Sequence, residues 1–260
     1  MTNIQIGAQM FSLRDLCQDE KTMLSALKSL KAMGYNICQL SGYNTAIPPE
    51  KLREMLDESG MQCVCTHTSF DLMRQDVKKV IEYHKILGCS YPGIGGLPGE
   101  YHDSPEGYKK FAGIANDIAK AFADAGMRFI YHNHAFELYR FPTGRSGLEI
   151  LFDSFVPEMQ FELDVFWVQM GGASPIDWIE KVAGRMDVVH FKEMNANPTN
   201  QGGLMTPIGE GNLNWPAIMA ACDRTGVKYA LIEQDNAPET DSLDCMRRSI
   251  VNLKAMGGRF

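Results

Sequence analysis

The sequence has no long apolar run, no export signal and little positive charge. No apolar stretch approaches the ~18 residues that a membrane-spanning helix needs, so we expect no membrane partner. The amino terminus lacks the basic and apolar segments of a secretory signal, and we expect a cytoplasmic protein. Because 25 Lys and Arg residues stand against 32 Asp and Glu residues, the net charge is -7, which argues against nucleic acid as a partner.

Three catalytic or redox signatures are also missing. The seven cysteines include no C-x-x-C pair, so neither a zinc ribbon nor a redox dithiol is indicated, and we expect reduced thiols in the core. No G-x-S-x-G elbow occurs, which argues against a serine hydrolase. The glycine-rich segment 92–96 lacks the full G-x-G-x-x-G pattern, so a dinucleotide site is only weakly indicated.

Short runs rich in β-branched and aromatic residues alternate with longer amphipathic stretches. The runs predict strands at 4–9, 36–40, 62–67, 90–95, 128–134, 160–164, 187–192 and 229–233. The amphipathic stretches predict helices at 20–33, 49–59, 71–87, 105–125, 175–183, 215–225 and 241–256, and segment 195–214 is expected to be the most loop-rich. This alternation predicts one α/β domain over residues 1–260, a single (β/α)8 TIM barrel, with a doubly wound open sheet as the alternative.

Polar residues gather where the predicted strands end. In a TIM barrel the carboxyl ends of the strands form the active site. Asp164, His190 and Glu233 end the last three predicted strands, each after an apolar run. Two carboxylates and an imidazole brought together there would need a counter-charge, which a divalent metal (Mn, Zn, Co or Mg) supplies. The alternative is that each is a separately hydrogen-bonded polar group.

The fifth predicted strand carries two histidines. His132 and His134 are two residues apart, so they share one face of a strand, and both face the barrel interior if Ile130 does. Glu137 follows in what we expect to be the loop over the barrel mouth. Two histidines beside the predicted metal cluster point to function rather than to core packing.

Several short motifs resemble the sugar phosphate isomerase/epimerase family of the xylose isomerase-like TIM barrel superfamily. The resemblance runs from Gly7 to the end of the chain and is carried by the segments GAQMFSLRD (7–15), YHNH (131–134), FELD (161–164), HFKE (190–193), GEGN (209–212) and IEQD (232–235). It implies one divalent metal held by a strand-five Glu, Asp164, His190 and Glu233. Because this chain has His-Asn-His where many relatives have Glu-Asn-His, either His132 or Glu137 takes the first place.

The resemblance implies proton abstraction next to a carbonyl, giving an enediolate of a sugar or keto-sugar that is free or phosphorylated. A catalytic base with a pKa near the working pH would remove the proton, and His132, His134 and Glu233 are the candidates. Lys192 would neutralise substrate charge, with a solvated strand-end lysine as the alternative.

Three further residues are predicted to bind the sugar. Gln9 and His67 end predicted strands, and Trp167 either forms an apolar wall for the sugar ring or is a core aromatic residue. The expected function is that of an isomerase or epimerase. The alternatives are a lyase or dehydratase acting on a keto-inositol or 3-keto-glycoside, and a non-catalytic sugar-binding barrel. Barrels of this family are often homo-oligomers, which gives the corresponding expectation here.

Overall fold

The computed structural model describes residues 4–200, 202–236 and 241–258 and contains a closed barrel of eight parallel strands. Around the barrel the strands follow the order β1-β10-β7-β6-β5-β4-β3-β2, with β1 pairing with both β2 and β10. The strands are β1 (Gln5–Gln9), β2 (Ile37–Leu40), β3 (Gln62–His67), β4 (Tyr91–Ile94), β5 (Phe129–His132), β6 (Met159–Asp164), β7 (Val188–Phe191) and β10 (Tyr229–Ile232). The predicted (β/α)8 barrel is confirmed.

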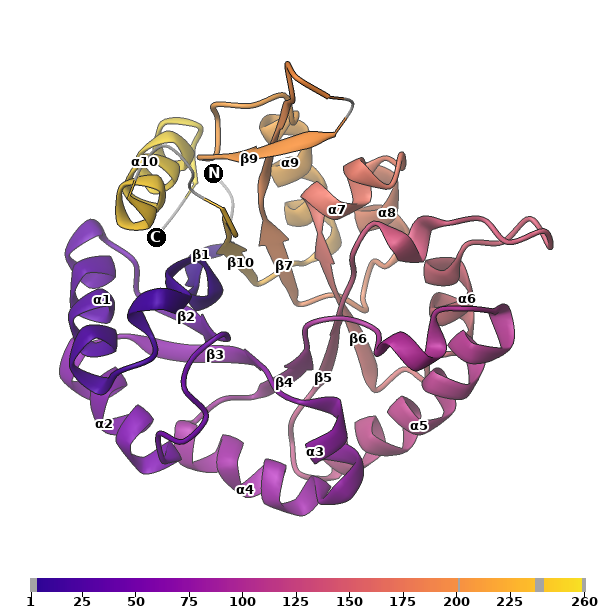
Figure 1. Cartoon of the computed structure of the whole chain (residues 1–260), viewed down its shortest axis with the longest axis horizontal. Coiled ribbons are helices and arrows are strands. Elements are labelled where there is room, and N and C mark those ends of the chain that lie inside the picture. The colour runs from indigo at the N-terminus through magenta and orange to yellow at the C-terminus, as the bar shows by residue number, and fades with distance from the viewer. Residues whose placement is uncertain (1–3, 201, 237–240, 259–260) are drawn as a thin grey trace.

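Helices form a ring outside the strands (Figure 1). They are α1 (Glu20–Met33), α2 (Pro49–Ser59), α3 (Phe70–Gln75), α4 (Val77–Leu87), α5 (Pro105–Asp124), α6 (Gly147–Ser154), α7 (Val165–Met170), α8 (Pro175–Lys181), α9 (Trp215–Thr225) and α10 (Ser242–Ala255). Short 3-10 turns are η1 (Met10–Leu16), η2 (Gly99–Tyr101) and η3 (Phe136–Leu138). Local sequence fixes many ends: Ser104 and Ser174 cap helices whose first residue is proline, and Gly34 ends α1 in the left-handed conformation.

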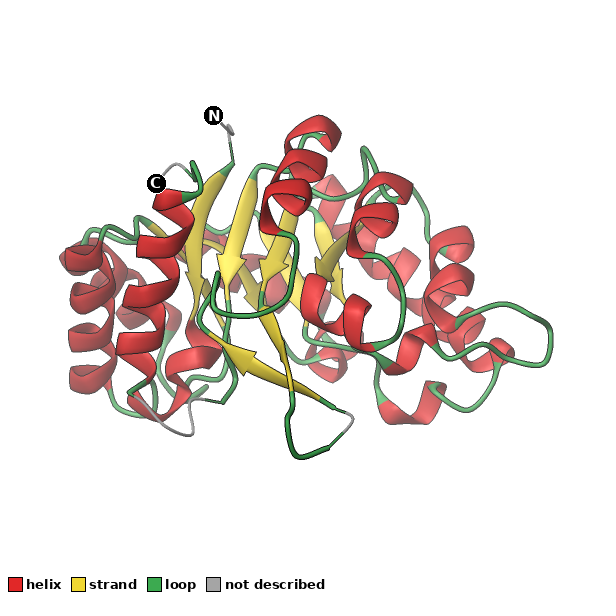
Figure 2. Ribbon diagram, turned by 90° about the horizontal axis from the view of Figure 1, so that it is seen from above, coloured by secondary structure: helices red, strands yellow, loops and turns green. Residues whose placement is uncertain are grey.

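Among the segments that differ from the sequence prediction are one helix and one loop. The helix predicted over 71–87 is divided at Asp76, whose non-helical backbone ends α3 and whose side chain accepts a hydrogen bond from the Lys79 N–H at the start of α4. The segment predicted as loop contains the antiparallel hairpin of β8 (Glu193–Ala196) and β9 (Gly203–Thr206). This hairpin lies beyond the carboxyl ends of the barrel strands (Figure 2).

The barrel interior is divided into an apolar and a polar layer. The apolar layer is a cluster of side chains that includes Ile37, Cys65, Ile130, Val188 and Leu231. Polar side chains replace it toward the carboxyl ends of the strands, where the mouth of the barrel opens. Burying polar groups costs free energy, and in this barrel that cost arises mainly at the carboxyl ends of the strands, as expected for a functional site.

The remaining composition-based predictions concern thiols and membranes. All seven cysteines are buried, so the prediction that they lie in the core is confirmed. Among the helices of the described residues, none combines the length and apolar character required to cross a membrane.

Candidate active site

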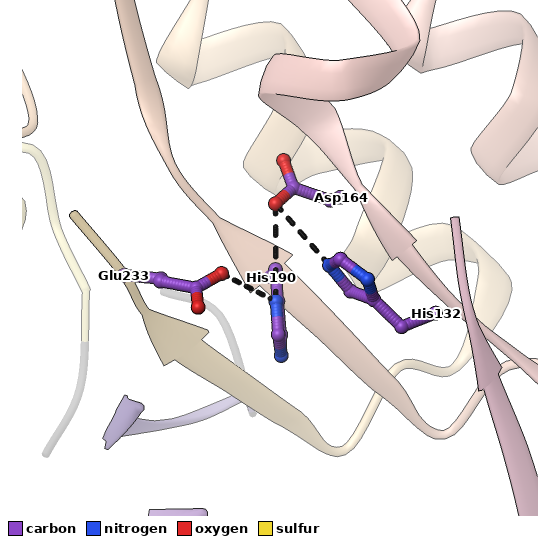
Figure 3. Close-up of side chains that lie close together, drawn as sticks. All are labelled: His132, Asp164, His190 and Glu233. Carbon is purple, nitrogen blue, oxygen red and sulfur yellow. Dashed lines mark hydrogen bonds and ion pairs between the residues drawn. The ribbon is translucent and has the colours of Figure 1, made fainter. Parts of the chain in front are cut away.

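Four buried side chains converge at the carboxyl ends of neighbouring strands (Figure 3). His132 ends β5, Asp164 ends β6, His190 lies on β7, and Glu233 directly follows β10. One nitrogen or oxygen atom from each lies within 4.8 Å of the others. The Asp164 Oδ2 atom is 3.4 Å from His132 Nε2 and 3.8 Å from His190 Nδ1, and Glu233 Oε2 is 2.9 Å from His190 Nδ1.

Hydrogen bonds on the far side of each imidazole direct a free nitrogen into this cluster. His132 Nδ1 lies 3.2 Å from the Gly95 carbonyl oxygen, which only accepts, so Nδ1–H donates and the Nε2 lone pair faces Asp164. His190 Nε2 lies 2.6 Å from Gln39 Oε1, which leaves Nδ1 facing the carboxylates. Both rings therefore turn their second nitrogen, His132 Nε2 and His190 Nδ1, toward the carboxylates at a common point, as metal-ligating histidines do.

Two atoms of the cluster have no hydrogen-bond partner among the described residues. His190 Nδ1 and Glu233 Oε2 are buried and close together, but they are not aligned for a hydrogen bond with each other. A buried carboxylate oxygen is costly unless a cation faces it, and Lys192 Nζ lies 3.1 Å from Glu233 Oε2. Oxygen and imidazole donors in this arrangement suit Mn²⁺, Zn²⁺, Co²⁺ or Mg²⁺, so the residues present fit the divalent metal that the sequence predicts.

Lys192 is buried against the same carboxylates, with only 1% of its side chain exposed. Its Nζ lies 3.2 Å from Asp164 Oδ2, 3.1 Å from Glu233 Oε2 and 2.9 Å from Asp235 Oδ2. Burial alone would lower the pKa of Lys192, but these carboxylates outweigh it and raise the pKa above its ordinary value. The solvated-lysine alternative is wrong: Lys192 is a buried ammonium group at the cluster.

His134 lies at the rim of the cluster, beyond the end of β5. The predicted strand over 128–134 ends at His132, but Ile130 faces inward and the His134 ring still lies 5.0 Å from that of His132. Burial, and then the neighbouring His132, lower the pKa of His134 to about 3, so its imidazole is neutral at physiological pH. Gly96 is needed beside it, because a Cβ at Gly96 would lie 3.0 Å from the His134 ring and the backbone there has φ +154°.

Trp167 forms an apolar surface next to His134. The Trp167 ring lies 5.3 Å from the His134 ring, and Lys192 Nζ lies 5.2 Å from the Trp167 centroid. Trp167 also lines a cavity of about 640 Å³ between α7 and the β8–β9 hairpin, together with Arg14, Met170, Leu204, Met205 and Asp235, among others. A cavity of this size accommodates a small organic molecule next to the cluster.

Glu137 does not reach the cluster. It lies on η3, fully buried, rather than in an open loop over the mouth. Its Oε1 accepts a hydrogen bond from the Tyr131 hydroxyl at 2.7 Å, and its Oε2 accepts from the His134 backbone N–H at 2.9 Å. The structure therefore brings His132, and not Glu137, together with the other three candidate ligands.

We expect replacement of Glu137 by Gln to remove a pH dependence of stability. Burial raises the pKa of Glu137 to about 8 despite its hydrogen bonds to Tyr131 and His134, whereas the unfolded chain loses this proton near 4.5. The unfolded state thus binds fewer protons between these values, so wild-type stability falls with rising pH, by up to about 1.4 kcal/mol per pH unit.

The measurement for this prediction is urea unfolding of the wild type and of Glu137→Gln at several pH values from 5 to 8. The variant should gain stability relative to the wild type as the pH rises, because Gln carries no proton to release. Parallel stability curves for the two proteins would contradict a raised pKa at Glu137.

The predicted substrate contacts Gln9 and His67 lie in a buried polar network beneath the cluster. Gln9 is fully buried and donates a hydrogen bond to Gln39 Oε1 at 2.8 Å, so its amide has partners inside the barrel. His67 is slightly exposed, and its Nε2 lies 2.6 Å from Glu162 Oε2. Sequence reasoning missed Glu162, although its position two residues before Asp164 places both on the inward face of one strand.

Sequence reasoning also missed Asp235, whose side chain holds Lys192. The sequence signal for a second acidic partner of Lys192 was the carboxylate of Asp235, two residues after Glu233. Its backbone carbonyl accepts a hydrogen bond from Arg14 Nη1 at 2.8 Å, which ties η1 to this rim of the mouth.

A closed parallel barrel with a buried His/Asp/Glu cluster at the carboxyl ends of its strands defines a TIM-barrel protein with a candidate metal centre. Residues 27–249 match the xylose isomerase-like TIM barrel family, and the chain belongs to this family. No match is found among curated proteins.

Solved structures share the fold at low sequence identity. A sugar phosphate isomerase/epimerase from Parabacteroides distasonis is 23% identical, with TM-score 0.82 over 98% of this chain and 95% of that chain. An L-ribulose 3-epimerase is 15% identical, with TM-score 0.74 over 97% and 94%. A probable 3-DHS dehydratase from Bacillus anthracis is 16% identical, with TM-score 0.70 over 99% and 100%. The similar structures thus include isomerases, epimerases and a dehydratase.

Proposed function

We propose that the protein is a divalent-metal-dependent isomerase or epimerase of a keto-sugar that acts through an enediolate. The observation that carries this proposal is the convergence of His132, Asp164, His190 and Glu233, which turn a ring nitrogen or a carboxylate oxygen toward one point within 4.8 Å of one another. When bound there, a divalent cation would act as a Lewis acid on the carbonyl and hydroxyl oxygens of the sugar.

The surrounding residues supply proton transfer and orientation. The Nδ1 atom of His134 lies at the rim of the cluster and has no hydrogen-bond partner among the described residues, so it can accept the proton from the carbon next to the carbonyl. Trp167 offers an apolar face for the sugar ring. Lys192 holds a positive charge beside the reacting oxygens and balances the carboxylates Asp164 and Glu233.

A lyase is the second candidate, and the pairing of His134 with Lys192 favours it. Elimination needs one base and one acid, and here the His134 imidazole lies 5.3 Å and the Lys192 ammonium group 5.2 Å from the Trp167 ring. Epimerisation needs two bases on opposite faces of the sugar. The site fits this less well, because His132 stands in place of the strand-five Glu and faces Asp164. The similarity in fold to a probable 3-DHS dehydratase is compatible with this alternative.

The test is a screen of keto-sugars, free and phosphorylated, with the Mn²⁺-loaded protein in D₂O, followed by NMR. An epimer or isomer carrying deuterium supports the isomerase, and loss of a leaving group supports the lyase. A sugar that binds without exchange or product would contradict both and would support the non-catalytic sugar-binding barrel.

For the substrate that this screen identifies, we expect His134→Gln to lower turnover and deuterium incorporation by roughly 10²–10⁴-fold, the usual contribution of a general base. Mn²⁺ content should stay at the wild-type level, because His134 is outside the candidate ligand set. His102→Gln is a matched control, since His102 Nε2–H donates a hydrogen bond to the Leu97 carbonyl oxygen in its own loop and His102 lies outside the cluster. Wild-type exchange in His134→Gln would show that another group is the base.

A further inference from the structure

Glu162 is a fully buried carboxylate to which the proposed reaction gives no role. It is outside the four candidate ligands, yet its Oε1 lies 3.2 Å from His190 Nε2, on the side of the ring opposite the cluster. We propose that Glu162 is a positioning residue that fixes the ring of His190 and thereby sets the affinity of the candidate metal centre. This inference rests on the metal centre of the proposed function.

Glu162 determines which way the Gln39 amide points. An ionised carboxylate only accepts hydrogen bonds, so the amide NH₂ of Gln39 must face it. Gln39 Nε2 donates to Glu162 Oε1 at 2.9 Å and to Oε2 at 3.2 Å. The Gln39 Oε1 atom is consequently turned toward His190 Nε2, at 2.6 Å, and also accepts from Gln9 Nε2.

His190 Nε2 is therefore held between two acceptors, Gln39 Oε1 and Glu162 Oε1. When a cation binds Nδ1, the one hydrogen of a neutral His190 ring resides on Nε2, where these two acceptors stabilise it. The Nδ1 lone pair then points to the side of Asp164 and Glu233, which is the tautomer that a ligand at this point requires.

The carboxylate of Glu162 is itself fixed on its other side. His67 Nε2 lies 2.6 Å from Glu162 Oε2, and the His67 ring packs over Gly95, where a Cβ would lie 3.1 Å from its Nδ1. Gln39, His67 and His190 thus hold Glu162 from three sides in a buried setting. Because these contacts fix the Glu162 carboxylate, Glu162 can in turn fix the orientation of the His190 ring.

The test compares the Mn²⁺ affinity of the wild type, Glu162→Met and Glu162→Gln, measured by competition with a chelator. Met fills the space but accepts hydrogen bonds only weakly, so we expect the Mn²⁺ affinity of this variant to fall by about 10–100-fold. Gln keeps an acceptor oxygen for Gln39 and His190 while losing the charge, so it should recover most of that loss. Wild-type affinity in a folded Glu162→Met, or Gln as weak as Met, would overturn positioning through hydrogen bonds.

A second measurement decides the question even if Glu162→Met does not fold. In Zn²⁺-loaded wild type with ¹⁵N-labelled histidine, the His190 signals, assigned by their loss in His190→Asn, should show a protonated Nε2 and a metal-bound Nδ1. A protonated Nδ1 would overturn the proposal. If the wild type binds neither metal, the metal centre of the proposed function fails as well, whereas metal binding insensitive to Glu162 overturns this inference alone.

Discussion

Asp164→Asn is expected to lose metal binding and to lower turnover of the identified keto-sugar by roughly 10²–10³-fold, while the barrel stays folded. Asn retains the oxygen that accepts hydrogen bonds from Phe166 N and Trp167 N at the start of α7, at 2.9 and 3.2 Å. It loses the negative charge that faces His132 and Lys192. The variant thus separates the metal-binding role of Asp164 from its role as a helix cap.

Bound metal per chain, measured by elemental mass spectrometry after incubation with Mn²⁺, tests this prediction together with the melting temperature. Asp187→Asn is the matched control, because Asp187 is a largely buried carboxylate that directly precedes the amino end of β7 and pairs with Arg128 and Lys228. It should bind Mn²⁺ as the wild type does. A stoichiometric metal content in Asp164→Asn would remove Asp164 from the ligand set.

Lys192→Met is expected to destabilise the metal-free protein by about 3–5 kcal/mol, the usual cost of removing one partner from a buried ion pair. The substitution leaves Asp164, Glu233 and Asp235 without the ammonium group that contacts all three. Mn²⁺ should restore part of this stability, because a bound cation supplies the missing positive charge and stabilises the folded state by mass action.

Urea unfolding with chelator and with Mn²⁺ measures both effects. Lys28→Met serves as the control, since Lys28 pairs with Glu58 at the surface and should contribute no more than about 1 kcal/mol. Mn²⁺ should raise the stability of Lys192→Met more than that of the wild type, because the ion no longer shares its carboxylates with a lysine. Equal stability of the two lysine variants without metal would contradict the role given to Lys192.

The barrel and three of its cluster residues could be predicted from the sequence because strand ends are marked locally. Asp164, His190 and Glu233 each follow an apolar run, and parallel strands bring their carboxyl ends to one face. The choice between His132 and Glu137 depended on the path of the chain after β5. That path turns into η3 and carries Glu137 back against Tyr131, a tertiary contact with no sequence signal.

Other features of the site depended on partners far away in the sequence. The burial of Lys192 follows from three carboxylates at the ends of two other strands, β6 and β10, and a lysine after an apolar run does not reveal them. The short helix α7 has six residues, too few for a helical hydrophobic period to be recognised. The β8–β9 hairpin falls in a segment rich in Asn, Gly and Pro, a composition typical of loops as well as of hairpin ends.

The central claim is that one divalent cation binds between four strand ends. Anomalous diffraction from crystals of the protein soaked in MnCl₂ tests it most directly. We expect a single manganese peak coordinated by His132, Asp164, His190 and Glu233. Glu137 should still accept its hydrogen bond from the His134 backbone N–H and should not contact the metal. No peak at this position, or a peak to which Glu137 rather than His132 is bound, would contradict it.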